Sequence, residues 1–406
     1  MSPRVSEPTP PTQSIWKQVH WRFTAAQIGY PLSVAYNARF VPFLPPTQLL
    51  TLIYTFVTGL TITAGYHRLW THRAYRAHIL LRILLASIGA GALQLPIRTW
   101  ARDHRAHHRF VDTDRDPYNS RRGLFYSHIG WILMYDTEAY GRGVDISDLD
   151  ADPIVVWQRR IYYPLAAMMG FMLPATVAGL GWGDWYGGLL YAGCLRVVVT
   201  WHASYCINSL AHWGGTQQYG DNSTARNNLF AAVFTLGEGY HNFHHVFPAD
   251  YRNGVRWYEL DPTKWWIWGF ERLGLAWDLR RFSGPEIEKV WVQQMERDAG
   301  QLRVRLDWGK ELSEVPVLQW AEFEKACTDG KPWVVINGVV HDVGEFCGQH
   351  PGGERLLLSA IGKDATEWFH GGVYSHSQVA LNILSTLRVA AISGGGKIEG
   401  NSHITA

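Results

Sequence analysis

The sequence of 406 residues predicts a helical integral membrane protein that continues into a small soluble α+β domain. Apolar stretches of about 20 residues, the length of a membrane-crossing helix, recur through the first half of the chain. After residue 311 the composition changes, and short apolar runs at 333–336 (WVVI) and 339–340 (VV) alternate with glycine and acidic residues. Short strands of this kind are typical of a small soluble domain.

Four apolar stretches are predicted to cross the bilayer: 24–44, 47–66, 161–181 and 184–207. A fifth run, 78–97, is also long enough, and it separates His72 from His104. Residues that bind one metal site must lie on one side of the membrane, so a single crossing between these histidines is excluded if both are ligands. We therefore expect residues 78–97 to enter or lie on one leaflet without spanning, whereas hydropathy alone gives five spans.

The distribution of positive charge predicts the orientation of the chain. Segments 98–122 and 252–281 are rich in Arg and Lys, which favours the cytosolic side of the membrane. With an even number of spans, both termini are then cytosolic. The net charge of +2 gives no reason to expect a nucleic-acid partner, and the four cysteines are scattered without a disulfide pattern.

Histidine spacing predicts a metal centre. An HxxxxH cluster and two HxxHH clusters occur within apolar sequence, and positions i, i+3 and i+4 share one face of a helix. Imidazole is a common ligand of iron, and the histidines are too many for one ion but enough for two. Surface or tag-like histidines would not show such repeated spacing. The eight clustered histidines are His67, His72, His104, His107, His108, His241, His244 and His245, and His212, in the separate segment NSLAH at 208–212, makes nine candidates.

These clusters resemble those of the acyl-CoA Δ9 (stearoyl-CoA) desaturases, and the words around them narrow the match. They are TAGYHRLW at 63–70, RDHRAHH at 102–108, DPYNSRRG at 116–123 and GEGYHNFHH at 237–245. The resemblance covers roughly residues 15–290. It implies a helical cytosolic cap that holds two Fe ions on the nine histidines, with O2 as co-substrate. It also implies that Asn208 reaches one metal through water.

Carboxylates and amides beside the clusters are expected to orient the imidazoles, although a salt-bridge role is an equal alternative for each. The candidates are Asp103, Asp112, Asp114, Asp116, Glu238 and Asn242. His20, His78, His128 and His202 lack the ligand spacing and are not assigned to the metals.

The resemblance implies a saturated acyl-CoA substrate whose chain enters a bent tunnel between the spans. Gln94, Trp100 and Ser204 match positions at the bend, and Thr55 and Gly59 match positions near its closed end. Gly59 serves equally well for close helix packing.

Only some of the family's contact positions for coenzyme A match residues of this sequence. Arg102 and Asp103 match family positions that touch it. Phe23, Leu95 and the pair at 135–136 differ from the residues expected there, which keeps an acyl-lipid substrate open.

The C-terminal domain resembles cytochrome b5. The carriers of this resemblance are HPGG at 350–353 and GKDAT at 362–366, and they imply heme b with His350 as one axial ligand. His376, in a His-Ser context, is the expected second ligand, and His370 is its competitor. Two imidazoles leave no open position on the iron, which suits electron transfer. His341 is predicted to lie at the surface.

The electrons would come from a separate NADH-cytochrome b5 reductase, because this chain shows no flavin or nucleotide motif.

Together these features match the fungal desaturases that carry a fused cytochrome b5 domain. The predicted segments are a disordered N-terminus (1–14), a membrane desaturase domain (15–283), a charged linker that forms a solvated helix (284–311), a heme domain (312–393) and a disordered tail (394–406). The expected enzyme inserts a cis double bond between C9 and C10 of C16 or C18 acyl-CoA at the endoplasmic reticulum. The alternatives are a di-iron lipid hydroxylase, an acyl-lipid desaturase and a membrane-anchored heme electron carrier.

Overall fold

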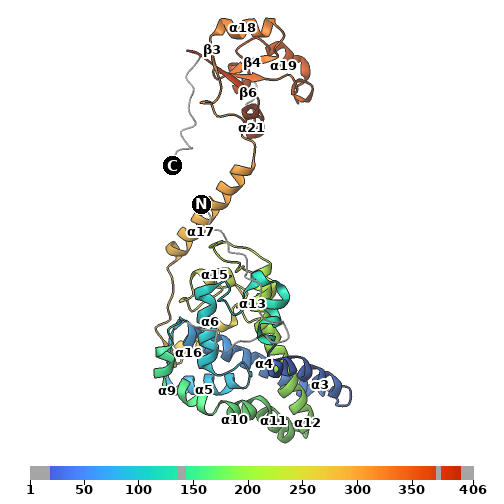
Figure 1. Ribbon diagram of the computed structural model, residues 1–406, viewed down its shortest axis with the longest axis vertical. Helices are drawn as coiled ribbons and strands as arrows, with labels where there is room; N and C mark the ends of the chain where they lie inside the picture. The colour runs from blue at the N-terminus through green and yellow to red at the C-terminus, as the bar shows by residue number, and fades with distance from the viewer. Residues whose placement is uncertain (1–18, 135–142, 372–375, 395–406) are drawn as a thin grey trace. The chain divides into compact units, whose positions relative to one another are not determined.

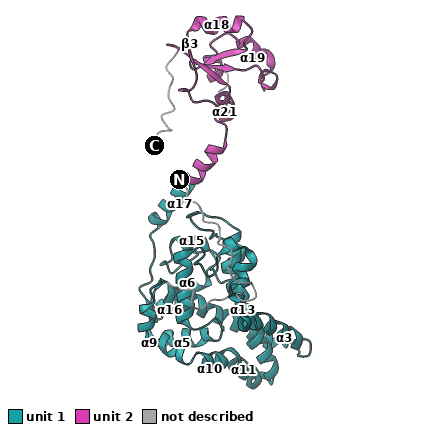
Figure 2. Ribbon diagram, in the orientation of Figure 1, with its two compact units in different colours: residues 1–296 teal, residues 297–406 magenta. Residues whose placement is uncertain are grey.

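The structure is a computed structural model that describes residues 19–134, 143–371 and 376–394. The chain forms two compact units, residues 1–296 and 297–406, which Figure 2 colours separately. The two ends predicted to be disordered lie outside the described residues, except for Gly394.

Unit 1 is built from helices, several of which join end to end into longer rods (Figure 1). Its first half contains α2 (Trp21–Thr24), η1 (Ala25–Gly29), α3 (Tyr30–Asn37), α4 (Pro45–Leu60), η2 (Thr61–Thr71), β1 (Arg76–Ala77), α5 (Ile79–Ala90), α6 (Ile97–Phe110), η3 (Ser120–Arg122), η4 (Tyr126–Gly130) and α7 (Trp131–Leu133). Its second half contains α8 (Ser147–Ala151), α9 (Pro153–Arg160), α10 (Tyr162–Ala167), η5 (Met168–Met172), α11 (Leu173–Trp182), α12 (Trp185–Gly187), η6 (Gly188–Leu195), α13 (Arg196–Trp213), α14 (Leu229–Phe234), α15 (His241–Val246), α16 (Pro262–Arg272) and β2 (Ala276–Trp277).

Two of these rods are long and apolar enough to cross a bilayer, judged by length and composition among the described residues. They are Pro45–Thr71, with 27 residues, and Tyr162–Trp182, with 21. The predicted stretch 24–44 corresponds to helical residues 21–37, because the chain turns before it resumes as a helix at Pro45. The predicted stretch 184–207 lies in the rod that α12, η6 and α13 form, where Arg196 and His202 lower the hydropathy.

The apolar run at 78–97 does not form a long helix. Its helix α5 has 12 residues, which at 1.5 Å per residue gives about 18 Å, whereas the hydrocarbon core is about 30 Å thick. The chain then breaks, and Leu93 and Leu95 adopt positive φ angles of 55° and 72°. A helix of this length is too short to span, as the prediction of a non-spanning segment requires.

A buried cation joins three of the helical rods. The Arg196 side chain is fully buried, and its Nη2 donates to the carbonyl oxygens of Gly91 (2.9 Å) and Gly170 (3.1 Å). Its Nε donates to the carbonyl of Ala192 (2.9 Å), and its guanidinium lies 4.7 Å from the ring centroid of Tyr54. These carbonyl oxygens replace water around the charge, so the contacts fasten the end of α5 to η5 and η6.

Unit 2 contains a four-stranded sheet of order β3-β6-β5-β4, in which β3 and β6 are parallel and the other pairs are antiparallel. Apolar clusters lie around Val334 and Ile336 and around Phe323 and Val335, so the sheet is covered on both faces. The elements are β3 (Val317–Leu318), α18 (Trp320–Thr328), β4 (Trp333–Ile336), β5 (Val339–Asp342), η7 (Cys347–Gln349), α19 (Glu354–Ala360), α20 (Thr366–His370), α21 (Gln378–Thr386) and β6 (Arg388–Ile392).

The prediction of a surface position for His341 is wrong. This residue lies in β5 and is only 3% exposed, and its Nδ1 contacts the carbonyl oxygen of Leu384 at 2.9 Å. Burial lowers the pKa of His341 to about 4. The end of α21 covers this side of the strand, a tertiary contact that the local sequence does not reveal.

A single helix, α17 (Gly284–Arg305), carries the chain across the boundary between the two units. Its 22 residues fall within the segment predicted to be a solvated helix. The residues after it already contact the heme domain, since Arg388 donates from Nη1 to the carbonyl of Lys310 at 3.1 Å. Gly309 has a φ of 73°, and a Cβ there would meet the Ser385 carbonyl oxygen at 1.8 Å, so this approach requires glycine.

Replacement of the buried cation tests its role in the fold. Arg196→Leu leaves the carbonyls of Gly91 and Gly170 without a donor, and each unsatisfied buried group costs about 1–3 kcal/mol. We expect the midpoint of thermal unfolding in detergent to fall by about 5 °C or more. Arg39→Leu, at an exposed position, is the control and should leave the midpoint unchanged. Equal midpoints for the two variants would contradict a structural role for Arg196.

Candidate metal centre

The nine predicted histidines converge from four segments, η2, α6, α13 and α15. The structure sorts them into two groups, and within each group one ring nitrogen per residue lies within 4.8 Å of all the others. The larger group contains His67, His72, His104, His108 and His244, and the smaller contains His107, His212, His241 and His245. This partition does not follow from the spacing, since each HxxHH motif is divided between the groups.

The HxxxxH spacing fits the unusual local geometry of η2. This segment is a π-helix in which bonds join residues five apart, and the backbone N–H of His72 donates to the His67 carbonyl at 3.1 Å. The two rings consequently stand close together, with centroids 4.8 Å apart. In an α-helix, residues five apart would point about 140° away from each other around the axis. The π-helical turn therefore brings both histidines to the same group.

Helix α6 gives the first and last histidines of its motif to the larger group. The Nε2 atoms of His104 and His108 lie 3.2 Å apart, one helical turn from each other. His244 of α15 joins them, with its Nε2 at 3.0 Å from that of His108 and 3.0 Å from that of His67.

Helix α15 makes the reciprocal contribution to the smaller group. The Nε2 atoms of His241 and His245 lie 3.0 Å apart, and His107 of α6 approaches His245 at 3.2 Å. His212 of α13 completes the group, with its Nε2 3.0 Å from that of His241. Helix α6 thus contributes His107 to the smaller group, and α15 contributes His244 to the larger group. Neither group is complete unless both helices are in place.

These residues fit two metal ions. The His72 Nε2 is buried and has no hydrogen-bond partner among the described residues, yet it belongs to the larger group. Burial, and then the neighbouring imidazoles, hold the pKa values of His104 and His244 well below the ordinary range, so both rings are neutral and keep a lone pair for a metal. A nitrogen donor set of this kind suits iron and other transition metals.

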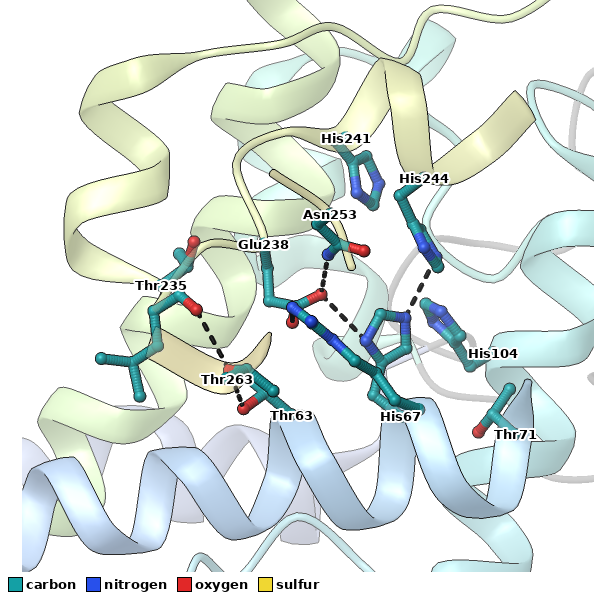
Figure 3. Close-up of polar contacts among 12 residues, drawn as sticks. Thr63, His67, Thr71, His104, Thr235, Glu238, His241, His244, Asn253 and Thr263 are labelled. Atoms are coloured by element: carbon teal, nitrogen blue, oxygen red, sulfur yellow. Dashed lines mark hydrogen bonds and ion pairs between the residues drawn. The ribbon is translucent and has the colours of Figure 1, made fainter. Parts of the chain in front are cut away.

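A buried carboxylate orients the first ligand. The Nδ1 of His67 lies 2.9 Å from Glu238 Oε2, and the Nδ2 of Asn253 donates to the same oxygen at 2.7 Å (Figure 3). Arg68 donates from Nη2 to Glu238 Oε1 at 2.8 Å and to Asp261 at 2.9 Å. Burial alone raises the pKa of Glu238, but His67 and Arg68 outweigh it and hold that pKa at about 2. The carboxylate is therefore charged and fixes the imidazole through Nδ1.

Two histidines of the smaller group also have an oxygen atom that contacts their Nδ1. The Nδ1 of His107 lies 2.8 Å from Asp116 Oδ1, and the Nδ1 of His212 lies 2.8 Å from the hydroxyl of Thr224. Asp112 accepts from both the backbone N–H and the hydroxyl of Thr224 at 2.6 Å, so it acts on His212 through that residue.

Three of the six predicted orienting residues are therefore placed at the imidazoles: Asp112, Asp116 and Glu238. Asp103 instead pairs with Arg102 at 2.6 Å, Asn242 donates to the carbonyls of Gly220 and Ala225, and Asp114 is exposed.

Sequence reasoning missed Arg68, Thr224 and Asp261. Of these three residues, only Arg68 could have been noticed in the sequence, because a charged residue directly after His67 in an apolar stretch suggests a buried ion pair. His128 and His202, which we did not assign, bond to each other at 3.1 Å and belong to neither group.

A cavity of about 690 Å³ adjoins the larger group, and His67 and His104 form part of its wall. This volume is typical of a small-molecule pocket. Six of the seven predicted substrate residues and Asn208 line it, whereas Arg102 is not among the lining residues. The six are Thr55, Gly59, Gln94, Trp100, Asp103 and Ser204. Phe23 and Leu95 line the same cavity, and residues 135–136 lie outside the described residues.

The three residues predicted at the bend contact one another. Gln94 donates from Nε2 to the Ser204 hydroxyl at 2.8 Å, and it accepts at Oε1 from the Trp100 indole N–H at 3.2 Å. The Gln94 amide therefore links Ser204 and Trp100 in this part of the cavity wall.

Two histidines of unit 2 face each other across a gap suited to a heme. The ring centroids of His350 and His376 lie 6.4 Å apart, which leaves room for one iron atom between them. The Nδ1 of His350 contacts the carbonyl of Gly353 at 3.3 Å, and the Nδ1 of His376 contacts the carbonyl of Phe369 at 2.7 Å, so backbone contacts orient both rings through Nδ1. A Cβ on Gly352 would meet the His350 ring at 2.8 Å, which explains the glycine there.

The competitor for the second axial position is engaged elsewhere. The Nε2 of His370 contacts the side-chain amide of Asn337 at 2.8 and 3.1 Å. The donor set and its glycine turn therefore fit a heme held by His350 and His376.

Comparison with known proteins agrees with both sites. A family model described as fatty acid desaturase matches residues 43–279, which include all nine histidines. The chain belongs to the fatty acid desaturase family. A second model, described as cytochrome b5-like heme/steroid binding domain, matches residues 319–393 and includes His350 and His376.

Two fungal relatives match the chain over nearly its whole length. The chain is 47% identical to a probable acyl-CoA desaturase of Schizosaccharomyces pombe, over 95% of this chain and 80% of that protein. It is 43% identical to acyl-CoA desaturase 1 of Saccharomyces cerevisiae, over 94% of this chain and 76% of the relative. Human stearoyl-CoA desaturase is 38% identical over 69% of this chain and 78% of its own length. This chain is thus a desaturase with a fused cytochrome b5-like domain.

The contact between Glu238 and His67 gives a prediction about metal retention. Glu238→Gln removes the charge that fixes the imidazole while it preserves the size of the side chain. We expect iron affinity to fall about 10- to 100-fold, as for other orienting partners of metal-bound histidines. The measurement is the iron content of the purified protein after dialysis against a graded chelator series, with the heme absorbance as the internal reference for folded chain.

Asp278→Asn is the matched control, because Asp278 forms an exposed ion pair with Arg76. It should retain iron like the unmodified protein. Equal retention in the Glu238→Gln and Asp278→Asn variants would contradict the orienting role of Glu238.

Proposed function

We propose that this chain is a Δ9 acyl-CoA desaturase of the endoplasmic reticulum that draws electrons from its own heme domain. The observation that carries the proposal is the position of the nitrogen-only metal centre, which forms part of the wall of a largely apolar cavity. An apolar chain in that cavity lies beside the metals, and the family membership and the fungal relatives agree with this substrate class.

The proposed ligands are the nine grouped histidines, with Asn208 reaching one metal through water. When bound by these residues, two irons would supply the activated oxygen that the reaction needs, since no side-chain acid or base removes hydrogen from a saturated carbon chain. In the overall reaction, two hydrogens from the substrate, two electrons and two protons reduce O2 to two molecules of water, and a cis double bond results.

The protein's own contribution is to position the chain and to exclude water. Gln94, Trp100 and Ser204 would shape a bend that places C9 and C10 beside the metals, so regioselectivity follows from geometry. Asp103 and its partner Arg102 would lie toward the coenzyme A end. Thr55 and Gly59 would line the part of the tunnel that receives the methyl end of the chain.

Electrons would reach the irons through heme b bound by His350 and His376. A heme with two imidazole ligands has no position for O2 and is suited to electron transfer. The cytochrome b5-like domain implies an electron-transfer partner, and we infer a separate NADH-cytochrome b5 reductase. A tethered donor reaches a local concentration on the order of millimolar, which favours repeated reduction of the metal centre.

The proposed topology has four spans and both termini in the cytosol. Two rods have the length and composition of spans, and the short helix α5 is consistent with a segment that enters one leaflet only. All metal ligands and the heme domain then lie on the same side of the membrane. We retain the proposed domain limits of 15–283 for the desaturase domain, 284–311 for the linker and 312–393 for the heme domain.

The decisive test is the fatty-acid profile of cells that lack their own desaturase and express this chain. We expect new cis-9 monounsaturated acids with 16 or 18 carbons, with the double bond located by mass spectrometry. His104→Ala removes a proposed ligand and should abolish these products while the heme spectrum persists. Hydroxylated products would indicate a di-iron hydroxylase, desaturation only of intact lipids would indicate an acyl-lipid enzyme, and no new product from holo-protein would indicate an electron carrier.

The axial assignment has its own test. His350→Ala should eliminate the heme absorbance, and desaturation should then depend on free cytochrome b5 supplied in addition. His370→Ala is the control, since His370 contacts Asn337, and it should keep the absorbance of the unmodified protein. A normal heme spectrum in the His350→Ala variant would show that the axial assignment is wrong.

A further inference from the structure

The cavity follows one face of the rod Pro45–Thr71 away from the metal centre. Leu52, Thr55, Phe56 and Gly59 all line it, and their spacing of three and four residues places them on the same face of α4. His67 lies eight residues beyond Gly59 on the same continuous rod, Pro45–Thr71. In the proposed topology, the cavity at Gly59 therefore lies deeper in the membrane than the metals.

At this depth a side chain from another part of the chain closes on α4. Leu236 lines the same cavity, and a Cβ added to Gly59 would lie 2.8 Å from Leu236 Cδ1. Leu236 therefore occupies the space that the missing side chain of Gly59 leaves. Gly59 and Leu236 thus form this part of the cavity wall together.

The backbone holds Leu236 in a strained conformation. Its φ is 58°, in the left-handed region that L-residues with branched side chains rarely adopt, and Gly237 follows with a φ of 99°. Thr263 donates from its hydroxyl to the Leu236 carbonyl at 3.1 Å, and the hydroxyls of Thr263 and Thr63 lie 2.7 Å apart (Figure 3). Such strain persists only where the surroundings fix it, and it is concentrated at functional sites.

The same short segment also reaches the metal centre. Glu238, two residues after Leu236, contacts the Nδ1 of His67 at 2.9 Å. Thr63, one turn before His67 on the same rod, contacts Thr263. Contacts on both sides of Leu236 therefore fix its position relative to His67.

We propose that Leu236, packed against Gly59, is a specificity-determining residue that sets the chain length of the acyl substrate. The inference rests on the proposed function, because it assumes that the acyl chain occupies this cavity with its reacting carbons beside the metals. Shorter chains end before the pair, and longer chains must pass it. Thr263 and Thr63 act as positioning residues for Leu236.

The test is competition between palmitoyl-CoA and stearoyl-CoA with the purified full-length protein, reconstituted with a reductase. Leu236→Ala removes the obstruction, and we expect the ratio of kcat/KM for the 18-carbon over the 16-carbon substrate to rise about tenfold. Leu236→Gly should do the same, and it also relieves the backbone strain, which protects the test against a variant that folds poorly. Gly59→Ala displaces Leu236 Cδ1 into the cavity and should lower the same ratio about tenfold.

Leu49→Ala is the matched control, because Leu49 lies on the same helix α4, is 59% exposed and is not among the residues that line the cavity. It should change the ratio less than about twofold. Ratios within twofold of the unmodified protein for Leu236→Ala, Leu236→Gly and Gly59→Ala, with cis-9 products still formed, would overturn the inference and leave the proposed function intact. A shift of the double bond without a change in chain preference would overturn it as well. Absence of cis-9 products from the unmodified protein would instead refute the proposed function.

Discussion

The buried ion pairs of Arg68 hold the metal centre together. Its side chain is 1% exposed and lies between the carboxylates of Glu238 and Asp261, directly after the ligand His67. Asp261 also accepts from the backbone N–H of Lys264 at 3.0 Å, which caps α16. Breaking a buried pair by removing one partner costs about 3–5 kcal/mol, because it leaves a charge without compensation. One cation thus ties η2 to the segment that carries the second HxxHH motif.

In the candidate metal centre, neutral histidines form the two groups, and the negatively charged carboxylates lie behind them. The nine grouped side chains are all histidines, whereas the carboxylates lie one step away, at His67, His107 and, through Thr224, His212. Neutral ligands tolerate burial beside an apolar cavity better than carboxylates would, since an uncompensated charge is costly there. The carboxylates still fix the orientation of the rings, which keeps each lone pair directed at its metal.

Much of the site could be predicted from residue types and spacing. The histidines were recognisable because HxxHH places three imidazoles on one helix face, and HPGG marked the heme turn by its local pattern. Their partition into two groups was not predictable, because His107 of α6 joins the group that contains His241 and His245 of α15, and His244 of α15 joins the group that contains His104 and His108 of α6. The π-helical geometry of η2 was also missed, since it has no clear signature in composition. His341 was placed wrongly because the covering residue, Leu384, is distant in sequence.

The sequence by itself determined the elements and their chemistry: apolar rods, histidine clusters, a heme turn and a helix that carries the chain from one domain to the other. These follow from short-range periodicity and from the donor properties of each side chain. The tertiary structure alone decided which histidines lie in one group, which carboxylates orient them and where Leu236 meets Gly59. Those pairings join residues far apart in the chain, and only the packing of the helices brings them within contact distance.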